Sequence, residues 1–303
     1  MATIEFSDEQ TMLMDTAADF CRKHSPLDRV RAQIDQPQGI DPSVWQEMID
    51  LGWLGITVPE QYGGLGLSLA DAVPIVESMG RHLMGSPFVA TTLATQALIQ
   101  SGSEAQKEQW VPQIAAGSAA SLALTEEDGN WNLNEVASFA EMQDGELLLT
   151  AKKCFVLDAA QAAVILVSAQ VEGAARLIAV SADQLPEGAL VRETVIDETR
   201  RSYTLQVDTL ALPADQLLPG SDFDSIEHAA LLLLSAEMSG GLAGVLHVII
   251  DYLTTRKQFD QYIGSYQSLK HPTVQILLSM EACRSHLYRA ATLIAQQDND
   301  QIE

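Results

Sequence analysis

Apolar residues recur at helical spacing along the first third of the chain. Three stretches carry this pattern: residues 12–20, 44–51 and 73–76. Apolar side chains three to four positions apart line one face of an α-helix. Asp41-Pro42 precedes the second stretch and is typical of a helix start. We therefore expect a helical domain over residues 1–119, interrupted by a glycine-rich ordered loop at residues 52–66.

The pattern then changes to short runs rich in Val, Leu, Ile and Thr, separated by Asp, Gly and Pro. Such runs are typical of β-strands bounded by turns. The expected strands are residues 121–125, 146–150, 163–168, 176–181 and 204–209. Several strands with turn signals between them predict a β-domain over residues 120–221, built as a sandwich or a barrel.

Helical spacing returns in residues 222–303. We expect one long helix over residues 223–259 and another over 271–297, with a turn at Gly264-Ser265. Residues 231–250 are apolar enough to be a membrane-span candidate. This stretch contains Glu237 and lacks the basic flanks of a membrane anchor, so we favour a helix buried in a helical assembly.

The charge balance excludes some classes of partner. The chain has 17 Lys and Arg against 41 Asp and Glu, a formal net charge of −24. Such a surface repels nucleic-acid phosphates and anionic lipid. The three cysteines form no CxxC pair, and no histidines cluster at ligand spacing, so we expect neither disulfides nor a metal site. The first residues lack the basic and apolar regions of a secretory signal, which favours a cytoplasmic location.

Five stretches in order along the chain resemble motifs of the acyl-CoA dehydrogenases. They are residues 52–66, Leu122-Ala123-Leu124-Thr125-Glu126 with Gly129, Lys153-Cys154-Phe155-Val156, residues 212–220, and Arg256-Lys257-Gln258-Phe259 with Ile263-Gly264 and Gln267. The resemblance implies an α+β fold of an N-terminal helical domain, a middle β-domain and a C-terminal helical domain. These domains together hold FAD and an acyl-CoA thioester. The family has a further helical segment beyond the position of Glu303, so we expect the C-terminal domain to be incomplete here.

The resemblance places Leu124, Thr125 and Phe155 at the flavin ring. The Thr125 hydroxyl and the adjacent backbone would hydrogen-bond the ring, and the Phe155 side chain would lie against it. Thr125 could instead satisfy local backbone, and Phe155 could be a core residue. Leu157 stands where the family usually has a hydroxyl residue, and Glu127 stands where it has proline. Trp53 and Tyr62 could line the acyl entrance or pack the loop.

The resemblance places Arg256, Phe259 and Gln267 at the pyrophosphate and adenine end of FAD, commonly that of a neighbouring subunit. An arginine pairs bidentately with pyrophosphate, although Arg256 could also be a solvated charge at a helix end. This assignment implies an oligomer, expected to be a tetramer. Asp260 stands where glycine is usual and Tyr262 where proline is common, and the added negative charge weakens a phosphate site.

The family reaction needs a carboxylate base that removes the α-proton of the thioester while hydride passes from the β-carbon to the flavin. One usual base position falls at Ala230 or Leu231, neither of which can take a proton, and the other lies beyond Glu303. Glu237 is the only carboxylate in the apolar stretch, and burial makes a carboxylate more basic. Either Glu237 is the base, or the base lies beyond Glu303, or this subunit has none. Glu237 could also be a structural, paired glutamate.

Three functions fit these observations. The first is FAD-dependent α,β-dehydrogenation of an acyl-CoA thioester to a trans-2-enoyl-CoA, with electrons passed to an electron-transfer flavoprotein. The second is a non-catalytic subunit that completes the FAD or substrate site of a steroid-type heteromeric member. The third is an acyl-CoA oxidase, in which oxygen replaces the electron-transfer partner. The motifs at Thr125 and Arg256 favour the first, whereas the apolar base position, Leu157, Asp260 and Tyr262 favour the second.

Overall fold

The computed structural model describes residues 8–36 and 39–295 and divides into two compact units. The sheet unit comprises Ala32–Leu67 and Gly85–Ala230. The helix unit comprises Met1–Arg31, Ser68–Met84 and Leu231–Glu303, as far as these ranges are described. Each predicted site residue therefore belongs to one unit or the other.

The sheet unit is built on one seven-stranded mixed sheet. Its strands are β1 (Ala119–Ala123), β2 (Phe139–Gln143), β3 (Glu146–Leu157), β4 (Ala162–Val171), β5 (Ala174–Ser181), β6 (Leu190–Arg192) and β7 (Ser202–Pro213). The strand order is β1-β4-β2-β3-β7-β6, with β5 paired to β4. β1 and β2 run parallel to β4, and the other pairs are antiparallel.

Alternating side chains fix the register of this sheet. Along β3, Leu147, Leu149 and Ala151 are buried in the core, and the residues between them are less buried. All five predicted strands are present, and β3 continues to Leu157. The pattern did not predict β2, in which only Ala140 is buried, or the three-residue β6. The strands form one mixed sheet, whereas the sequence predicted a sandwich or barrel.

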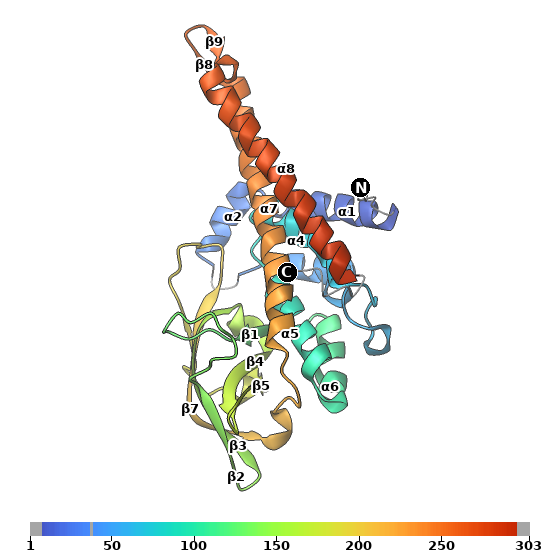
Figure 1. Ribbon diagram of the computed structural model, residues 1–303, viewed down its shortest axis with the longest axis vertical. Helices are drawn as coiled ribbons and strands as arrows, with labels where there is room; N and C mark the ends of the chain where they lie inside the picture. The colour runs from blue at the N-terminus through green and yellow to red at the C-terminus, as the bar shows by residue number, and fades with distance from the viewer. Residues whose placement is uncertain (1–7, 37–38, 296–303) are drawn as a thin grey trace. The chain divides into compact units, whose positions relative to one another are not determined.

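Helices α5 (Phe88–Ser101) and α6 (Glu104–Ala115) belong to the same unit and share a second core with β4 and β5 (Figure 1). α3 (Pro42–Asp50) begins where predicted, since Asp41 accepts a hydrogen bond from the Ser43 backbone N–H at 2.9 Å. The predicted ordered loop follows as two 3-10 turns, Trp53–Gly55 and Glu60–Tyr62. Trp53 and Tyr62 are both buried there, so they pack the loop.

The helix unit contains α1 (Asp8–His24), α4 (Val73–Arg81), most of α7 (Phe223–Thr255) and α8 (Gln267–Ala295); α2 (Leu27–Ile34) begins in it. Two glycines allow α4 and α7 to touch along their backbones. A Cβ atom on Gly80 would collide with the carbonyl oxygen of Glu237, and one on Gly240 with that of Glu77. These positions therefore require glycine for close packing.

The end of α7 differs from the sequence prediction. The helix stops at Thr255, and the short strands β8 (Lys257–Gln258) and β9 (Gln261–Tyr262) form a hairpin at the end of α7 and α8 (Figure 1). Phe259 and Asp260 make its two-residue turn with φ of 51° and 61°. A turn with two positive φ values matches the twist of a hairpin and interrupts a helix. α8 begins at Gln267 instead of residue 271, and its predicted end at Gln297 lies outside the described residues.

α7 is long and apolar enough to cross a membrane by length and composition, with a mean hydropathy of 1.7 over its most apolar window. Length and hydropathy alone are weak evidence for a membrane-spanning helix, because the core helix of a soluble protein has the same properties. In the structure, 39% of that window is buried.

Candidate functional site

A buried ion pair joins Glu126, which follows β1, to Lys153 of β3. The Lys153 ammonium is fully buried, and its Nζ lies 2.7 Å from Glu126 Oε1 and 2.9 Å from Ser168 Oγ. Glu126 also accepts hydrogen bonds from the Ala137 and Ser138 backbone N–H groups and from the Ser138 hydroxyl. These contacts attach the loop that follows β1 to strands β3 and β4.

The hydrogen bonds to Glu126 outweigh its burial. Burial alone would raise the pKa of this carboxyl, but the bonds from Lys153, Ser138 and Ala137 lower it to about 2. Burial lowers the pKa of Lys153, and its hydrogen bond and charge interaction with Glu126 oppose that shift. The interaction between the two side chains therefore favours the charged form of each.

Thr125 lies directly beside this pair and contacts strand β3. Its hydroxyl donates to the Cys154 carbonyl at 2.6 Å, and the Cys154 N–H donates to the Thr125 carbonyl at 3.0 Å. The neighbouring Leu124 carbonyl accepts from Ser168 Oγ at 3.3 Å and from Lys153 Nζ at 3.4 Å. Leu124 and Thr125 are therefore held against the residues that precede Phe155.

Phe155 projects from an irregularity in β3. The register with β7 shifts between Lys153, opposite Leu205, and Val156, opposite Tyr203. Phe155 has a φ of 55°, and its side chain is 56% exposed although its strand neighbours Cys154 and Val156 are buried. A positive φ in a bulky residue is strained and re-aims the side chain, so the bulge presents an aromatic ring at the surface of the sheet unit.

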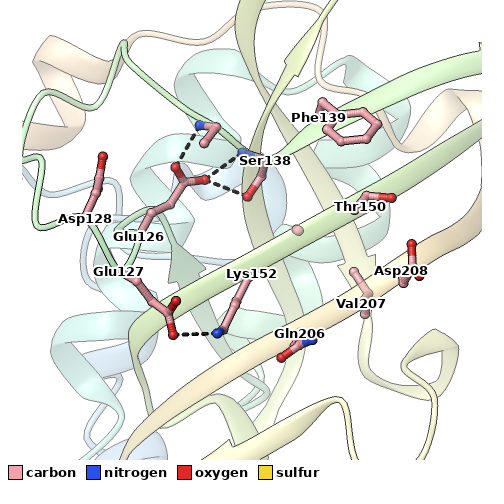
Figure 2. Close-up of a pocket in the computed structure, with 12 residues that line it drawn as sticks. Glu126, Glu127, Asp128, Ser138, Phe139, Thr150, Lys152, Gln206, Val207 and Asp208 are labelled. Carbon is pink, nitrogen blue, oxygen red and sulfur yellow. Dashed lines mark hydrogen bonds and ion pairs between the residues drawn. The ribbon is translucent and has the colours of Figure 1, made fainter.

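A pocket of about 560 Å³ lies beside Glu126 in the sheet unit (Figure 2). Its lining includes the Glu126 to Asp128 segment, Phe139, Lys152 and Asp208. Figure 2 shows the Lys152 side chain directed at Glu127, with Nζ and Oε1 2.6 Å apart. Leu124, Thr125 and Phe155 are not among its lining residues. The pocket therefore borders the Glu126 carboxylate without including the predicted flavin contacts.

The remaining cofactor candidates lie together on the hairpin end of the helix unit. Arg256 is the residue between α7 and β8, Phe259 is 87% exposed at the hairpin tip, and Gln267 is the first residue of α8. The Ile263 N–H donates to the Arg256 carbonyl at 2.9 Å, which fixes the hairpin relative to the helix end. The structure thus gathers the predicted residues into two sets, one in each unit.

Glu237 lies on α7 where the helix crosses α4, and it is half-buried. A different glutamate, Glu77 of α4, is the centre of a polar network in this unit. Its carboxylate accepts from Arg284 Nε at 2.8 Å, Tyr288 Oη at 2.7 Å and Ser239 Oγ at 3.0 Å. This network ties α4, α7 and α8 together.

Sequence reasoning missed Glu77, Arg284 and Tyr288, as well as the pair of Glu126 and Lys153. The pair had a visible signal, because Lys153 occupies an inward position of an alternating strand and a buried charge needs a partner. The Glu77 network had none, since its members are more than two hundred residues apart in two cases. Within residues 8–36 and 39–295, no three His, Cys, Asp or Glu side chains are grouped to hold a metal ion.

Comparison with known proteins identifies the family. Residues 7–118 match the model of the acyl-CoA dehydrogenase N-terminal domain, and residues 228–303 match that of the C-terminal domain. The chain belongs to the acyl-CoA dehydrogenase family. This membership confirms the resemblance, the predicted fold class and the predicted enzyme class of acyl-CoA dehydrogenase oxidoreductases.

Known acyl-CoA dehydrogenases align with most of the chain. FadE12 of Mycobacterium bovis is 28% identical over 84% of this chain and 70% of its own length. IpdE2 of Mycobacterium tuberculosis is 28% identical over 92% of this chain and 74% of its own. The solved structure of the Tcur3481-Tcur3483 steroid ACAD G363A variant has a TM-score of 0.84 at 26% identity, covering 95% of this chain and 81% of that one.

Acyl-CoA dehydrogenase membership implies FAD, and the residues present fit this group. An exposed aromatic ring on a bulged strand, as at Phe155, offers a flat apolar surface to a flavin. The exposed Arg256 offers a guanidinium to a pyrophosphate. The Thr125 hydroxyl already donates its proton to Cys154, so toward a bound ring its oxygen is an acceptor.

Proposed function

We propose that this chain carries an FAD site and takes part in the α,β-dehydrogenation of an acyl-CoA thioester to a trans-2-enoyl-CoA. The bulge at Phe155 is the observation that supports this most strongly. Exposing a phenylalanine with a positive φ costs free energy in two ways, through strained backbone and through apolar surface left in water. A flavin ring stacked on the side chain would cover that surface. When bound, FAD supplies the hydride acceptor, and Leu124 and Thr125 border the ring beside Phe155.

The hairpin residues are proposed to hold the other end of FAD. Arg256 would pair with the pyrophosphate, and Phe259 and Gln267 would contact the adenine end. Following the family pattern, we assign this contact to the FAD of a neighbouring subunit, which makes the protein an oligomer, with a tetramer as the proposed form. The exposed apolar residues along α7 and α8, among them Leu234, Val245 and Leu278, support burial in such an assembly.

We propose Glu237 as the base that takes the α-proton. Glu237 is the only carboxylate in the apolar stretch at residues 231–250, and it lies where α7 crosses α4. Electrons would then pass to an electron-transfer flavoprotein, and a cytoplasmic location is part of the same proposal.

A second candidate is a partner subunit without a base of its own. The resemblance puts one usual base position at Ala230 or Leu231, and neither takes a proton. The solved steroid ACAD carries two component names, Tcur3481 and Tcur3483, and a heteromeric assembly of this kind would let another subunit supply the base. The behaviour of Glu237 variants separates the two candidates.

The experiment that tests the FAD site is retention of the cofactor through gel filtration. The protein is loaded with FAD, and wild type is compared with Phe155→Ala and Arg256→Ala. Both variants should lose most of the flavin, whereas the exposed controls Phe139→Ala and Lys270→Ala should keep it. Full flavin content in both site variants would contradict the proposed site.

A further inference from the structure

The carboxylate of Glu193 holds the backbone of Phe155. The Phe155 N–H lies 3.2 Å from Glu193 Oε2 and 3.3 Å from Oε1. The carboxylate is itself fixed by the Ser202 hydroxyl at 2.6 Å and the Thr204 hydroxyl at 2.8 Å, both from β7. Glu193 directly follows β6, and its own N–H donates to the Ser202 carbonyl at 2.9 Å. Side chain and backbone of Glu193 are thus both anchored to β7.

The bulge needs such an acceptor because it disrupts the ladder between β3 and β7. Lys153 lies opposite Leu205 and Val156 opposite Tyr203, so Cys154 and Phe155 share the position facing Thr204. The Cys154 N–H and carbonyl are both satisfied by Thr125. The Phe155 N–H is satisfied by Glu193 instead of by a strand partner. Thr125 and Glu193 therefore hold the same peptide group of the bulge, Thr125 at the Cys154 carbonyl and Glu193 at the Phe155 N–H.

We propose that Glu193 is a positioning residue for the flavin, acting through Phe155. It keeps the bulge in the conformation that directs the Phe155 ring out of the sheet, against the isoalloxazine of bound FAD. The inference rests on the FAD site proposed above and adds a residue outside the motifs that predicted that site.

A carboxylate suits this role because it accepts from the Phe155 N–H and from two hydroxyls at once. Glutamine preserves the shape, since its carbonyl oxygen accepts from the Phe155 N–H and one hydroxyl, and its amide donates to the other hydroxyl. Alanine removes all three contacts and leaves the N–H without its acceptor. Glu193→Gln should therefore keep the conformation of the bulge at Phe155, whereas Glu193→Ala should lose it.

The first measurement uses the full chain without FAD. Hydrogen exchange of the Phe155 amide, followed by mass spectrometry of peptides spanning the bulge, should become about tenfold faster in Glu193→Ala. It should stay near the wild-type rate in Glu193→Gln and in Glu187→Ala, an exposed glutamate in the preceding turn. Wild-type exchange in Glu193→Ala would overturn the proposal. If that variant does not fold, Thr204→Val removes one of the two clamping hydroxyls and should speed exchange in the same direction.

The second measurement is the visible circular dichroism of the FAD-loaded proteins. Glu193→Ala should shift or weaken the flavin bands, and Glu193→Gln should restore them. Altered exchange with unchanged flavin bands would also overturn the proposal, because Glu193 would then hold the strand without positioning the ring. A wild-type protein that retains no FAD would contradict the proposed site itself, and this is seen before any variant is compared.

Discussion

Lys153 Nζ and Glu126 Oε1 lie 2.7 Å apart at the end of β1, with the Lys153 side chain fully buried. The preceding residue in the strand, Lys152, pairs with Glu127 at 2.6 Å, but both of those side chains are exposed. Two adjacent ion pairs of similar length therefore differ mainly in their access to water. Burial makes the loss of one partner costly, because the other charge is left without compensation.

Lys153→Met should destabilise the protein by about 3–5 kcal/mol, and so should Glu126→Gln, because each leaves its partner buried and unpaired. The double variant should be more stable than either single variant. Lys152→Met, which breaks only the exposed pair, should cost about 1 kcal/mol or less. Denaturant unfolding of the four variants measures these differences. Equal costs for Lys152→Met and Lys153→Met would contradict this account.

The same pair predicts a loss of stability in acid. The pKa of Glu126 is about 2 in the folded protein, against an ordinary value of 4.5. A depressed carboxyl pKa contributes stability that is complete above the unfolded value and is lost as the pH falls toward 2. The free energy of unfolding should therefore fall more steeply between pH 4.5 and 2 in wild type than in the Glu126→Gln and Lys153→Met double variant. If the free energy of unfolding changed with pH in the same way in both proteins, the lowered pKa of Glu126 would be contradicted.

The buried carboxyl of Asp158 should have the opposite effect, because it should lower the free energy of unfolding as the pH rises. Burial raises the pKa of this carboxyl to about 6 from an ordinary 3.8, although Arg200 and Arg201 oppose the shift. Ionising it in the folded protein therefore costs stability, and the cost develops as the pH rises from 3.8 to 6. Asp158→Asn should stabilise the protein by about 3 kcal/mol at pH 7.5 and by less at pH 4.5.

Asp144→Asn is the control for this variant, because Asp144 also has a positive φ but is exposed. The effect of Asp144→Asn on the free energy of unfolding should be small. Thermal unfolding at the two pH values compares the variants. Asp158→Asn that is neutral at pH 7.5 would mean that the buried carboxylate is fully compensated.

Neighbouring glycines of α7 should respond in opposite ways to alanine. A Cβ atom at Gly240 would collide with the Glu77 carbonyl, so Gly240→Ala should cost about 1–3 kcal/mol. At Gly241 the nearest atom is at 3.8 Å, and alanine there should stabilise the helix by about 0.5–1 kcal/mol. Urea unfolding distinguishes the two, and similar effects would show that α4 and α7 do not pack closely.

Glu237→Gln should slow flavin reduction by an acyl-CoA thioester about a hundredfold or more while leaving FAD bound, because an amide cannot take the α-proton. Glu227→Gln, an exposed glutamate earlier on α7, should behave as wild type. Stopped-flow absorbance at the flavin band measures both rates. An unchanged rate in Glu237→Gln would exclude Glu237 as the base and leave a base beyond residue 303 or one from another subunit.

Local patterns predicted the parts of the fold that depend on local rules. The run of Leu and Thr at residues 146–150 identified β3, and Asp41 with Pro42 identified the start of α3. The hairpin after α7 was not predicted, because strands of two residues are too short to show an alternation of apolar and polar side chains. Its turn also uses Phe259 and Asp260 in place of the usual Asn-Gly.

The candidate site, like the fold, could be predicted from the sequence only in part. Its motif residues were found by resemblance, and membership of the family is now shown, whereas their roles remain predictions. Glu193 could not be found from sequence, because it meets Phe155 only after β3, β6 and β7 are paired. The contact of Glu77 with Arg284 likewise joins helices far apart in the chain.

We propose above that this protein binds FAD and oxidises an acyl-CoA thioester. The most direct test of this proposal is the visible spectrum of the FAD-loaded protein during anaerobic titration with a panel of acyl-CoA thioesters. We predict that the flavin band bleaches with at least one of them, in proportion to the thioester added. Flavin that stays oxidised with every thioester of the panel would contradict the claim of a dehydrogenase half-reaction.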